Sequence, residues 1–497
     1  MENSLILAID QGTSSTKTII FNTKGEVLAK ATEILETNYL EGGYVEQNPE
    51  GIYQNVLLSV KTCLAVFTSN GGKIEDIKSA GISNQRETFI VWDKSGKAIA
   101  PAVVWQCKRS ISICEDLNSK NGIADQVKNK TGLIIDPYFS GTKLIWLNQN
   151  NEDVKNKIQS GEAFFGTVDT WLLYKLTNGQ KYLTDYTNAS RTLLFNLEKL
   201  EWDTELIETF GLTGINLPEP KPSSFHYGES LFDGLFEKPL PITAMIGDSH
   251  AAAFGEGCLN PGTAKATLGT GCSVLMNIGD KPKSSASGMI TTICWSTEER
   301  VDYALEGVIV SCGSTIEWMK NELQLFGESR ETEAMATSVQ DNNGVYIVPA
   351  FSGLGAPYWN MSRKASIEGL TFDCKKNHIV RAALETIPFQ IKAVLDAMQK
   401  DTGVPIQELM VNGGITANDF VMDFLTDLLD SKVIKSTMPD VSALGAAYLA
   451  GLGAGIFKNL EEVQQLFGER PALNSGKYLE AGKQFQVWND LVDVDNT

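Results

Sequence analysis

Two stretches of the chain share one order of apolar and polar positions. Residues 5–9 form an apolar run too short for a helix, residues 12–16 are a glycine followed by hydroxyl side chains, and residues 18–21 are again β-branched or apolar. Residues 264–279 repeat this order, with 269–272 as the polar part. Each stretch predicts a strand, a tight polar turn and a second strand. The repeat, a little over half the chain away, predicts two related halves.

The polar turns have the composition of a phosphate site. Successive backbone N–H groups and short hydroxyls can point at one anion, and the first turn offers Thr13, Ser14 and Ser15, with Thr270 at the matching place in the second. Asp10 ends the first strand, where its carboxylate could hold a metal ion through water. The first turn alone fits an ordinary hairpin equally well. The second copy favours a ligand held between two halves.

Charged side chains stand at the ends of other predicted strands. Arg86 and Glu87 follow one buried run, and Asp248 follows the strand 242–246 and precedes a helix. Strand ends are where open α/β sheets bind ligands, so we expect Arg86 to donate hydrogen bonds to one small polar molecule and Glu87 to accept them. We expect Asp248 to accept a proton. The alternatives are a surface salt bridge for the pair and helix capping for Asp248.

Periodicity and turn residues predict the remaining elements. Apolar residues at helical spacing predict helices over 50–67 and 377–398, and the small residues of 443–455 predict a helix packed closely on a neighbouring backbone. The polar stretch 184–191 predicts a loop that walls the cleft. The Gly413-Gly414 turn before a helix would let a base or ribose approach the backbone.

Length and composition narrow the class of protein. A chain of 497 residues predicts two domains, which we place at 1–245 and 246–497. The net charge of −19 argues against nucleic-acid binding. The eight cysteines are scattered without a CxxC or Cys/His cluster, so neither a disulfide framework nor a structural zinc site is indicated. The absence of a signal-like or membrane-length apolar run predicts a cytoplasmic protein without stable membrane insertion.

Several segments together resemble the FGGY carbohydrate kinases of the actin and hexokinase superfamily, and most closely the members that phosphorylate glycerol. The resemblance covers nearly the whole chain and is carried by AIDQGTSSTK, SNQRETFIVWD, VVWQCKR, FSGTKLIWL, VDTWLLYKLT, GTGC, ASIEGLTFDCKKNHIVRAALE and NGGITANDF. It implies an α/β fold of two ribonuclease-H-like domains with a cleft between them. It also implies transfer of the γ-phosphate of ATP to a small polyol, with glycerol as the first candidate.

The resemblance also implies a role for individual residues. Arg86, Glu87, Trp105, Tyr138 and Asp248 match polyol-binding positions, although core packing is the commoner role of a tryptophan such as Trp105. Asp248 would be the base, and Asp10 and Asp248 would hold Mg²⁺. The positions implied to contact the nucleotide are Thr13, Ser14, Ser15, Lys17, Thr270, Gly313, Glu317, Gly414 and Asn418. A homo-oligomer, dimer or tetramer, is implied as well.

Four positions depart from the residues usual in the glycerol-phosphorylating members. Lys17 replaces an arginine and Glu317 a glutamine. Ser249 replaces the glutamine after the base, and Ser273 replaces an aromatic residue after GTGC. The two serines would line a larger substrate pocket. A tetritol, pentitol or ketopentose is therefore the alternative substrate.

The sequence also bears on how the protein is regulated and on whether it is a catalyst. The segment 229–241 lacks the Gly/Arg loop that binds fructose 1,6-bisphosphate in some relatives, and His226 sits differently from a histidine that others phosphorylate. We expect neither regulator to act. A non-catalytic sugar or nucleotide sensor is a remote alternative, because four residues expected of a working kinase are all present: Asp10, Thr13, Asp248 and Thr270.

Overall fold

A mixed six-stranded sheet forms the centre of the first half of the molecule. The computed structural model describes residues 4–436 and 438–493. The sheet runs in the order β14 (Ser224–Ser230), β15 (Leu240–Gly247), β6 (Ile77–Asn84), β1 (Leu5–Gln11), β2 (Ser15–Asn22) and β3 (Val27–Ile34). β1 pairs antiparallel with β2 and parallel with β6, and β6 pairs parallel with β15. The predicted strand–turn–strand unit at the N-terminus is confirmed.

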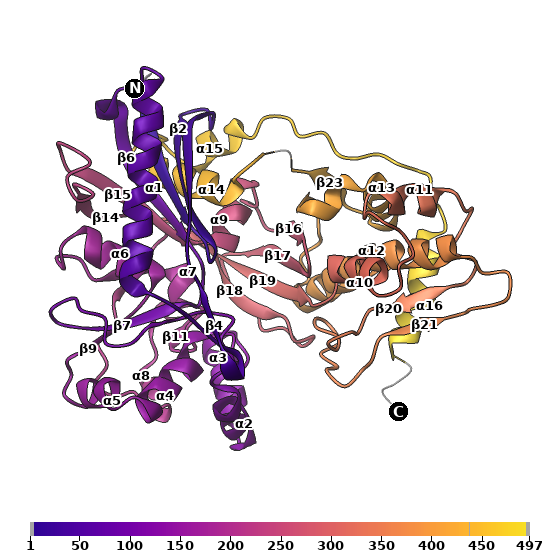
Figure 1. Cartoon of the computed structure of the whole chain (residues 1–497), viewed down its shortest axis with the longest axis horizontal. Coiled ribbons are helices and arrows are strands. Elements are labelled where there is room, and N and C mark those ends of the chain that lie inside the picture. The colour runs from indigo at the N-terminus through magenta and orange to yellow at the C-terminus, as the bar shows by residue number, and fades with distance from the viewer. Residues whose placement is uncertain (1–3, 437, 494–497) are drawn as a thin grey trace.

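A second sheet repeats this pairing in the later half. Its order is β18 (Ile290–Ser296), β19 (Val301–Ile309), β17 (Cys272–Gly279), β16 (Thr263–Leu268), β22 (Glu408–Asn412) and β23 (Lys432–Lys435). β16 pairs antiparallel with β17 and parallel with β22, as β1 does with β2 and β6. The two related halves predicted from the repeated turn are therefore present, and the predicted α/β fold class is confirmed (Figure 1).

Two helices lie between the sheets. α9 (Asp248–Gly255) and α14 (Val441–Gly453) pack on each other, and their apolar side chains join Ile6 of the first sheet and Met410 of the second in one core. A Cβ on Gly445 would lie 1.9 Å from the carbonyl oxygen of Ala251, so only glycine permits this approach. The close packing predicted for the small-residue helix is confirmed.

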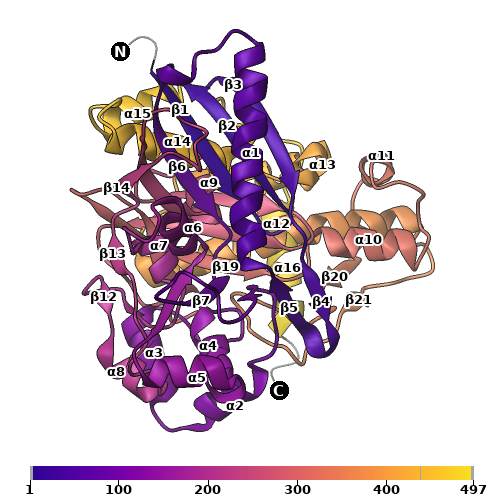
Figure 2. The same cartoon turned by 60° about the vertical axis from the view of Figure 1, so that its left-hand side comes forward.

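Longer helices cover the outer faces of the sheets. α1 (Pro49–Ser69) covers the outer face of the first sheet, opposite α14, and lies in front of that sheet in Figure 2. α12 (Lys376–Thr402) packs against β17 and β19 of the second sheet. Its neighbours are α10 (Gly313–Asn321), α11 (Glu331–Thr337), α13 (Asp419–Leu428) and α16 (Ala481–Asp493). The division at residues 245 and 246 stays a prediction, and α14, from late in the chain, packs on strands of the first sheet.

A smaller five-stranded sheet extends the first half and positions Trp105 and Tyr138. Its order is β4 (Asn38–Leu40), β5 (Tyr44–Gln47), β8 (Ala102–Val103), β7 (Phe89–Asp93) and β9 (Ala163–Thr167). Besides α1, this half contains the helices α2 (Ile111–Ser119), α3 (Ile123–Thr131), α4 (Ser140–Asn150), α5 (Glu152–Gln159), α6 (Val168–Leu176) and α8 (Thr204–Thr209), and the short helix α7 (Tyr186–Ala189). Short strand pairs are β11 (Phe195–Asn196) with β12 (Glu201–Trp202) and β20 (Tyr346–Val348) with β21 (Ser366–Glu368), and α15 (Leu460–Leu466) follows α14. The 3₁₀ turns are η1 (Glu41–Gly43), η2 (Ile74–Asp76) and η3 (Gly414–Ala417).

The prediction of a polar loop over 184–191 is wrong. The segment forms β10 (Leu183–Asp185), paired with β13 (Glu219–Lys221), and the short helix α7 (Tyr186–Ala189). The Asp185 carboxylate accepts the N–H groups of Thr187 and Asn188 and so caps α7. These polar side chains are buried because they satisfy one another, which composition alone does not reveal.

None of the helices within residues 4–436 and 438–493 combines the length and apolarity needed to span a bilayer.

Candidate active site

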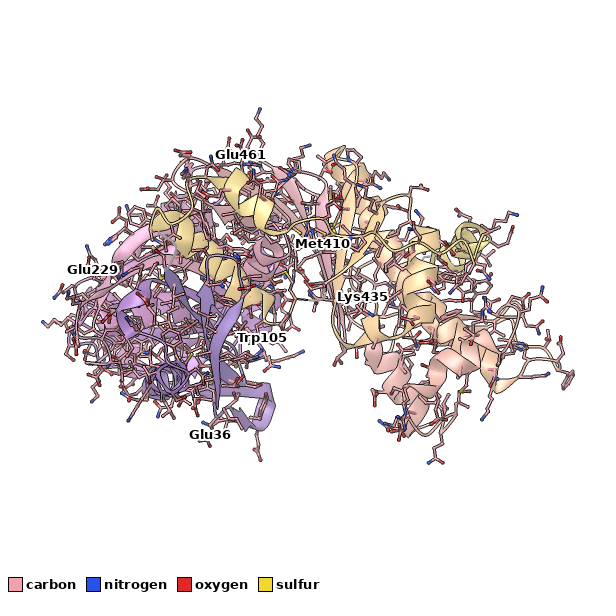
Figure 3. The ribbon with its side chains drawn as sticks, turned by 90° about the horizontal axis from the view of Figure 1, so that it is seen from above. Glu36, Trp105, Glu229, Met410, Lys435 and Glu461 are labelled. Carbon is pink, nitrogen blue, oxygen red and sulfur yellow. The ribbon has the colours of Figure 1, made fainter. Side chains whose placement is uncertain are left out.

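A cavity of about 370 Å³ lies where the two sheets face each other. The seven residues predicted to bind the polyol all line it: Arg86, Glu87, Trp105, Tyr138, Asp248, Ser249 and Ser273. Figure 3 shows Trp105 at the edge of one lobe and Lys435 at the facing edge of the other. We call this space the acceptor cavity.

Arg86 and Glu87 belong to a buried cluster of four charges. Arg86 donates two hydrogen bonds to Glu306 of β19, from Nη2 at 2.9 Å and from Nη1 at 3.2 Å. Arg191 donates from Nε to Glu87 at 2.6 Å, and its Nη1 lies 2.7 Å from Glu306 Oε2. The direct contact between Arg86 and Glu87 is longer, 4.0 Å. The surface salt bridge considered for this pair is wrong, because both residues are buried and each has its main partner elsewhere.

The cluster joins the two halves of the chain. Arg86 follows β6 of the first sheet, whereas Glu306 is on the second sheet. Its arginines hold the pKa of Glu306 well below the usual value, although burial opposes them. Glu306 therefore stays ionised and keeps the Arg86 guanidinium at the wall of the acceptor cavity.

Asp248 begins α9 at the floor of this cavity. Its side chain opens into the cavity, with 40% of the side-chain surface exposed, and Oδ1 lies 3.6 Å from Arg86 Nε. Oδ1 accepts the N–H of Ser249 at 2.6 Å. Gly247, not Asp248, occupies the N-cap position, so the capping role considered for Asp248 is wrong. Burial raises the pKa of Asp248, while the charge of Arg86 and the Ser249 N–H act to lower it. A carboxylate held in this way can accept a proton from a bound hydroxyl.

Trp105 and Tyr138 form an aromatic wall of the cavity. Their rings meet edge to face, with centroids 5.6 Å apart. Trp105 Nε1 donates to Thr13 Oγ1 at 2.9 Å, which ties the wall to the first polar turn. Beneath them the buried Lys143 donates from Nζ to the carbonyl oxygens of Tyr138, at 2.9 Å, and Trp105, at 3.2 Å. Burial lowers the pKa of Lys143 to about 8.

A second cavity of about 420 Å³ opens beside the second polar turn. It is lined by the five nucleotide positions predicted for the later half: Thr270, Gly313, Glu317, Gly414 and Asn418. A Cβ on Gly414 would meet nothing within 4 Å, so the backbone there is open to a ligand. Asn418 stands at the N-cap of α13 and accepts the N–H of Val421.

The residues of the first turn that were predicted to contact the nucleotide do not line the 420 Å³ cavity. Thr13 lines the acceptor cavity, whereas Ser14, Ser15 and Lys17 line neither of these two spaces. Ser14 is exposed. Lys17 Nζ lies 3.1 Å from an Asp440 carboxylate oxygen, at the start of α14. The ammonium group of Lys17, which was predicted to contact a phosphate, is therefore already paired with a carboxylate.

Asp10 and Asp248 form a pair of carboxylates suited to a hydrated cation. Burial raises the pKa of Asp10 to about 6, and the charge of Asp248 adds to the rise, while a hydrogen bond from Ser83 at 3.0 Å opposes it. Among the described residues no group of three or more His, Cys, Asp or Glu side chains is placed to hold a metal. Mg²⁺ commonly uses one or two carboxylates, with water and substrate phosphates as its other ligands, so this pair fits it.

Sequence reasoning missed several polar residues of the acceptor region. Glu306 and Arg191 complete the charge cluster, and Lys265 and Asn412 line the cavity. One feature of the sequence could have revealed Lys265 and Glu306: each is a charged residue inside an apolar segment predicted to be a buried strand. Asn412 follows an apolar strand directly before the Gly413-Gly414 turn. Arg191 was hidden in the segment taken for a loop.

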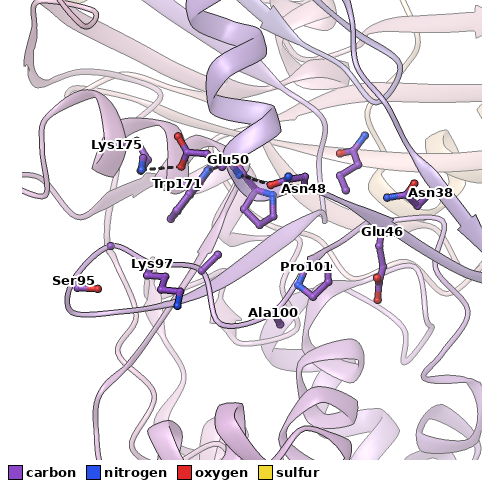
Figure 4. A pocket seen from close by; sticks show the side chains of 14 residues that line it. Asn38, Glu46, Asn48, Glu50, Ser95, Lys97, Ala100, Pro101, Trp171 and Lys175 are labelled. Atoms are coloured by element: carbon purple, nitrogen blue, oxygen red, sulfur yellow. Dashed lines mark hydrogen bonds and ion pairs between the residues drawn. The ribbon is translucent and has the colours of Figure 1, made fainter.

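A larger cavity of about 650 Å³ lies away from these residues, at the N-terminus of α1. Figure 4 shows its charged rim, where Lys175 pairs with Glu50 at 2.9 Å. Gln47 lines it and donates from its side-chain amide to the carbonyl oxygen of Thr13 at 2.7 Å. None of the predicted site residues lines this cavity.

Comparison with known proteins identifies the family. The model of the FGGY family of carbohydrate kinases, N-terminal domain, matches residues 5–255, and that of the C-terminal domain matches residues 264–454. The chain is 45% identical to a glycerol kinase of Caldanaerobacter subterraneus, over 93% of this chain and 92% of that protein. It is 43% identical to glycerol kinase 2 of Thermotoga maritima, over 98% of both. The crystal structure of Plasmodium falciparum glycerol kinase with ADP superposes with a TM-score of 0.93 at 35% identity, covering 99% of this chain and 98% of that one. The chain therefore belongs to the FGGY family of carbohydrate kinases.

Proposed function

We propose that this protein transfers the γ-phosphate of ATP to a terminal hydroxyl of glycerol. One observation carries the proposal: the β16–β17 hairpin borders both cavities. Its tip, including Thr270, lines the 420 Å³ cavity, while Thr267 and Ser273 on its flanks line the acceptor cavity. A nucleotide in the 420 Å³ cavity would have its terminal phosphate at the turn between β16 and β17, next to an alcohol in the acceptor cavity. The relatives named glycerol kinase support glycerol as that alcohol.

The acceptor residues have complementary hydrogen-bonding roles in this scheme. Arg86 donates to an acceptor hydroxyl oxygen, and Glu87 accepts from a neighbouring hydroxyl. Tyr138 and Trp105 cover the carbon chain. Asp248 orients the attacking hydroxyl and takes its proton as the bond to phosphorus forms. Phosphoryl transfer has a loose transition state, so alignment and charge neutralisation supply most of the catalysis.

Asp10 and Asp248 are the residues that would hold Mg²⁺. When bound, the ion neutralises negative charge on the phosphates. The raised pKa of Asp10, to which the charge of Asp248 contributes, supports this assignment, because a cation held by these residues would offset the repulsion of their charges.

Closure of the two halves is part of the proposal. Ser14, Ser15 and Lys17 would reach the phosphates when the first turn moves toward the second, and Lys17 would then leave Asp440. Closure would also exclude water, which competes with the alcohol as phosphate acceptor.

A larger acceptor is the second candidate. Ser249 and Ser273 both line the acceptor cavity, and Ser273 Oγ lies 3.4 Å from Glu306 Oε1. Small hydroxylated side chains leave room for further carbons of an acceptor and can bond its hydroxyls. A tetritol, pentitol or ketopentose would use that space.

A coupled assay of ADP release across an acceptor panel tests both candidates. The panel holds glycerol, erythritol, xylitol, arabitol, dihydroxyacetone and ribulose. Turnover of glycerol supports the main proposal. A kcat/KM for a four- or five-carbon acceptor that equals or exceeds the glycerol value supports the enlarged pocket, whereas strict glycerol preference refutes it. Absence of transfer to every acceptor refutes the kinase proposal and supports a sensor.

The dimeric or tetrameric state, the cytoplasmic location and the lack of response to fructose 1,6-bisphosphate stay predictions.

A further inference from the structure

Lys265 is a buried cation at the acceptor cavity that the mechanism above does not use. Lys265 is 2% exposed and lines the acceptor cavity. Its Nζ donates to Thr267 Oγ1 at 3.1 Å, and no carboxylate of the described residues forms an ion pair with it. A lysine ammonium has three N–H donors. Two of them are therefore available to a ligand.

The strand places this lysine on the cavity side of the second sheet. Side chains alternate along β16, and Ala264, Ala266 and Leu268 point to the core beneath α12. Lys265 and Thr267 point the other way. The register partners of Lys265, Leu275 on β17 and Met410 on β22, belong to the apolar layer between the sheets.

A charge in these surroundings is costly without a counter-ion. Asp248 lines the same cavity, and the charge of Lys265 helps to lower the pKa of its carboxyl group, after Arg86 and the Ser249 N–H. Asp248 is farther away than an ion-pair contact. The space between them is where the acceptor hydroxyl and the phosphate would meet.

The second polar turn borders the space between Lys265 and Asp248 on the side of the nucleotide cavity. The tip of the hairpin lines the nucleotide cavity from Leu268 to Thr270, directly beyond Thr267. Lys265 thus lies on the same strand as the phosphate turn, and its ammonium bonds the side chain next to that turn. We propose that Lys265 is a catalytic residue that binds the γ-phosphoryl group during its transfer, an inference that rests on the proposed kinase function.

The transfer step forms one bond, breaks another and moves one proton. The acceptor oxygen forms a bond to the γ-phosphorus, and the bond from that phosphorus to the β,γ-bridging oxygen breaks. ADP leaves with the electron pair, and the hydroxyl proton goes to Asp248. Lys265 keeps its protons and donates hydrogen bonds to the equatorial phosphoryl oxygens, where charge accumulates.

A positioning role through Asp248 makes a different prediction. If Lys265 acted only by stabilising the ionised base, its removal would raise the pKa of Asp248 and shift the acid limb of the pH–kcat profile to higher pH. The plateau above that limb would keep its height. A lysine that binds the phosphoryl group contributes at every pH.

The experiment compares wild type, Lys265→Met and Lys265→Arg, with Lys94→Met, whose side chain is 75% exposed, as the matched control. In Lys265→Met we expect kcat to fall by about a hundredfold across the pH profile, the loss typical of one transition-state donor. The glycerol KM should change less than twofold, and Lys265→Arg should recover part of kcat. Titration calorimetry with ADP and with the β,γ-imido analogue of ATP should show that the methionine variant loses preference for the third phosphate.

Two results would overturn the inference. The first is a wild-type kcat in a Lys265→Met protein whose melting temperature is unchanged. The second is a shifted acid limb with an unchanged plateau. If the methionine variant melts early, Lys265→Gln replaces it in the same assays. If wild type itself transfers no phosphate, the kinase proposal fails, and the two calorimetric affinities still report whether Lys265 contacts the γ-phosphate.

Discussion

Replacing Glu306 with glutamine tests whether the buried charge cluster holds Arg86 in its working position. Glu306 is 2% exposed and accepts two hydrogen bonds from Arg86, while Arg191 lies 2.7 Å from it. Removing one partner of a buried ion pair costs about 3–5 kcal/mol. The glutamine oxygen can keep one of the two hydrogen bonds, so we expect a loss of about 3 kcal/mol in the free energy of unfolding, from the lower end of that range.

The kinetic effect follows from the freed guanidinium. Arg86 Nε lies 3.6 Å from Asp248 Oδ1, so an Arg86 released from Glu306 would pair with the base. Loss of the Glu306 charge and a closer Arg86 both lower the pKa of Asp248. We expect the acid limb of the pH–kcat profile to move to lower pH. We also expect the glycerol KM to rise about tenfold, the cost of roughly 1.4 kcal/mol of binding energy.

Calorimetry and steady-state kinetics measure these effects together. A loss of about 3 kcal/mol should lower the melting temperature by about 6–12 °C, from roughly 2–4 °C per kcal/mol for domains of about this size. Glu480→Gln is the control, because Glu480 pairs with Lys483 on the surface and both are well exposed. The Glu480→Gln substitution should change neither the melting temperature nor the glycerol KM. A Glu306→Gln protein with wild-type melting temperature, glycerol KM and pH profile would refute the clamping role.

Two further predictions concern the acceptor space and the first turn. Ser273→Phe should lower kcat/KM for a pentitol or ketopentose about tenfold or more, since misfit in a pocket costs about 1–3 kcal/mol, and should leave the glycerol value unchanged; equal losses for both would argue against a size filter. Asp440→Asn should lower the KM for ATP, because Lys17 no longer has to leave a carboxylate; an increase in that KM would show that Asp440 instead holds Lys17 in place for the phosphates.

Local patterns predicted those parts of the site that are built from one segment. The two polar turns are visible because an apolar run, a glycine and hydroxyls adjoin in sequence. Arg86 and Asp248 are visible because each stands where a buried strand ends. The structure brings Thr13, Arg86 and Asp248 to one cavity, whereas Thr270 of the second turn lines the neighbouring one.

Long-range partners could not be predicted in this way. Glu306 and Arg191 are far apart in sequence, and only the packing of α7 on β18, the strand beside β19, brings them together. The segment 184–191 has the composition of a loop, and its burial depends on mutual capping. The position of α14 between the sheets depends on Gly445 meeting α9, a contact that small residues permit without specifying the partner.

The most direct test of the account is phosphate transfer by Asp248→Asn with nucleotide binding verified. Asparagine keeps the size of the side chain but cannot take the hydroxyl proton. With ATP affinity and melting temperature near wild type, we expect kcat for glycerol to fall by about 10²–10⁴, the contribution of a positioned general base. An undiminished kcat in that folded, nucleotide-bound variant would contradict the assignment of Asp248 as the base.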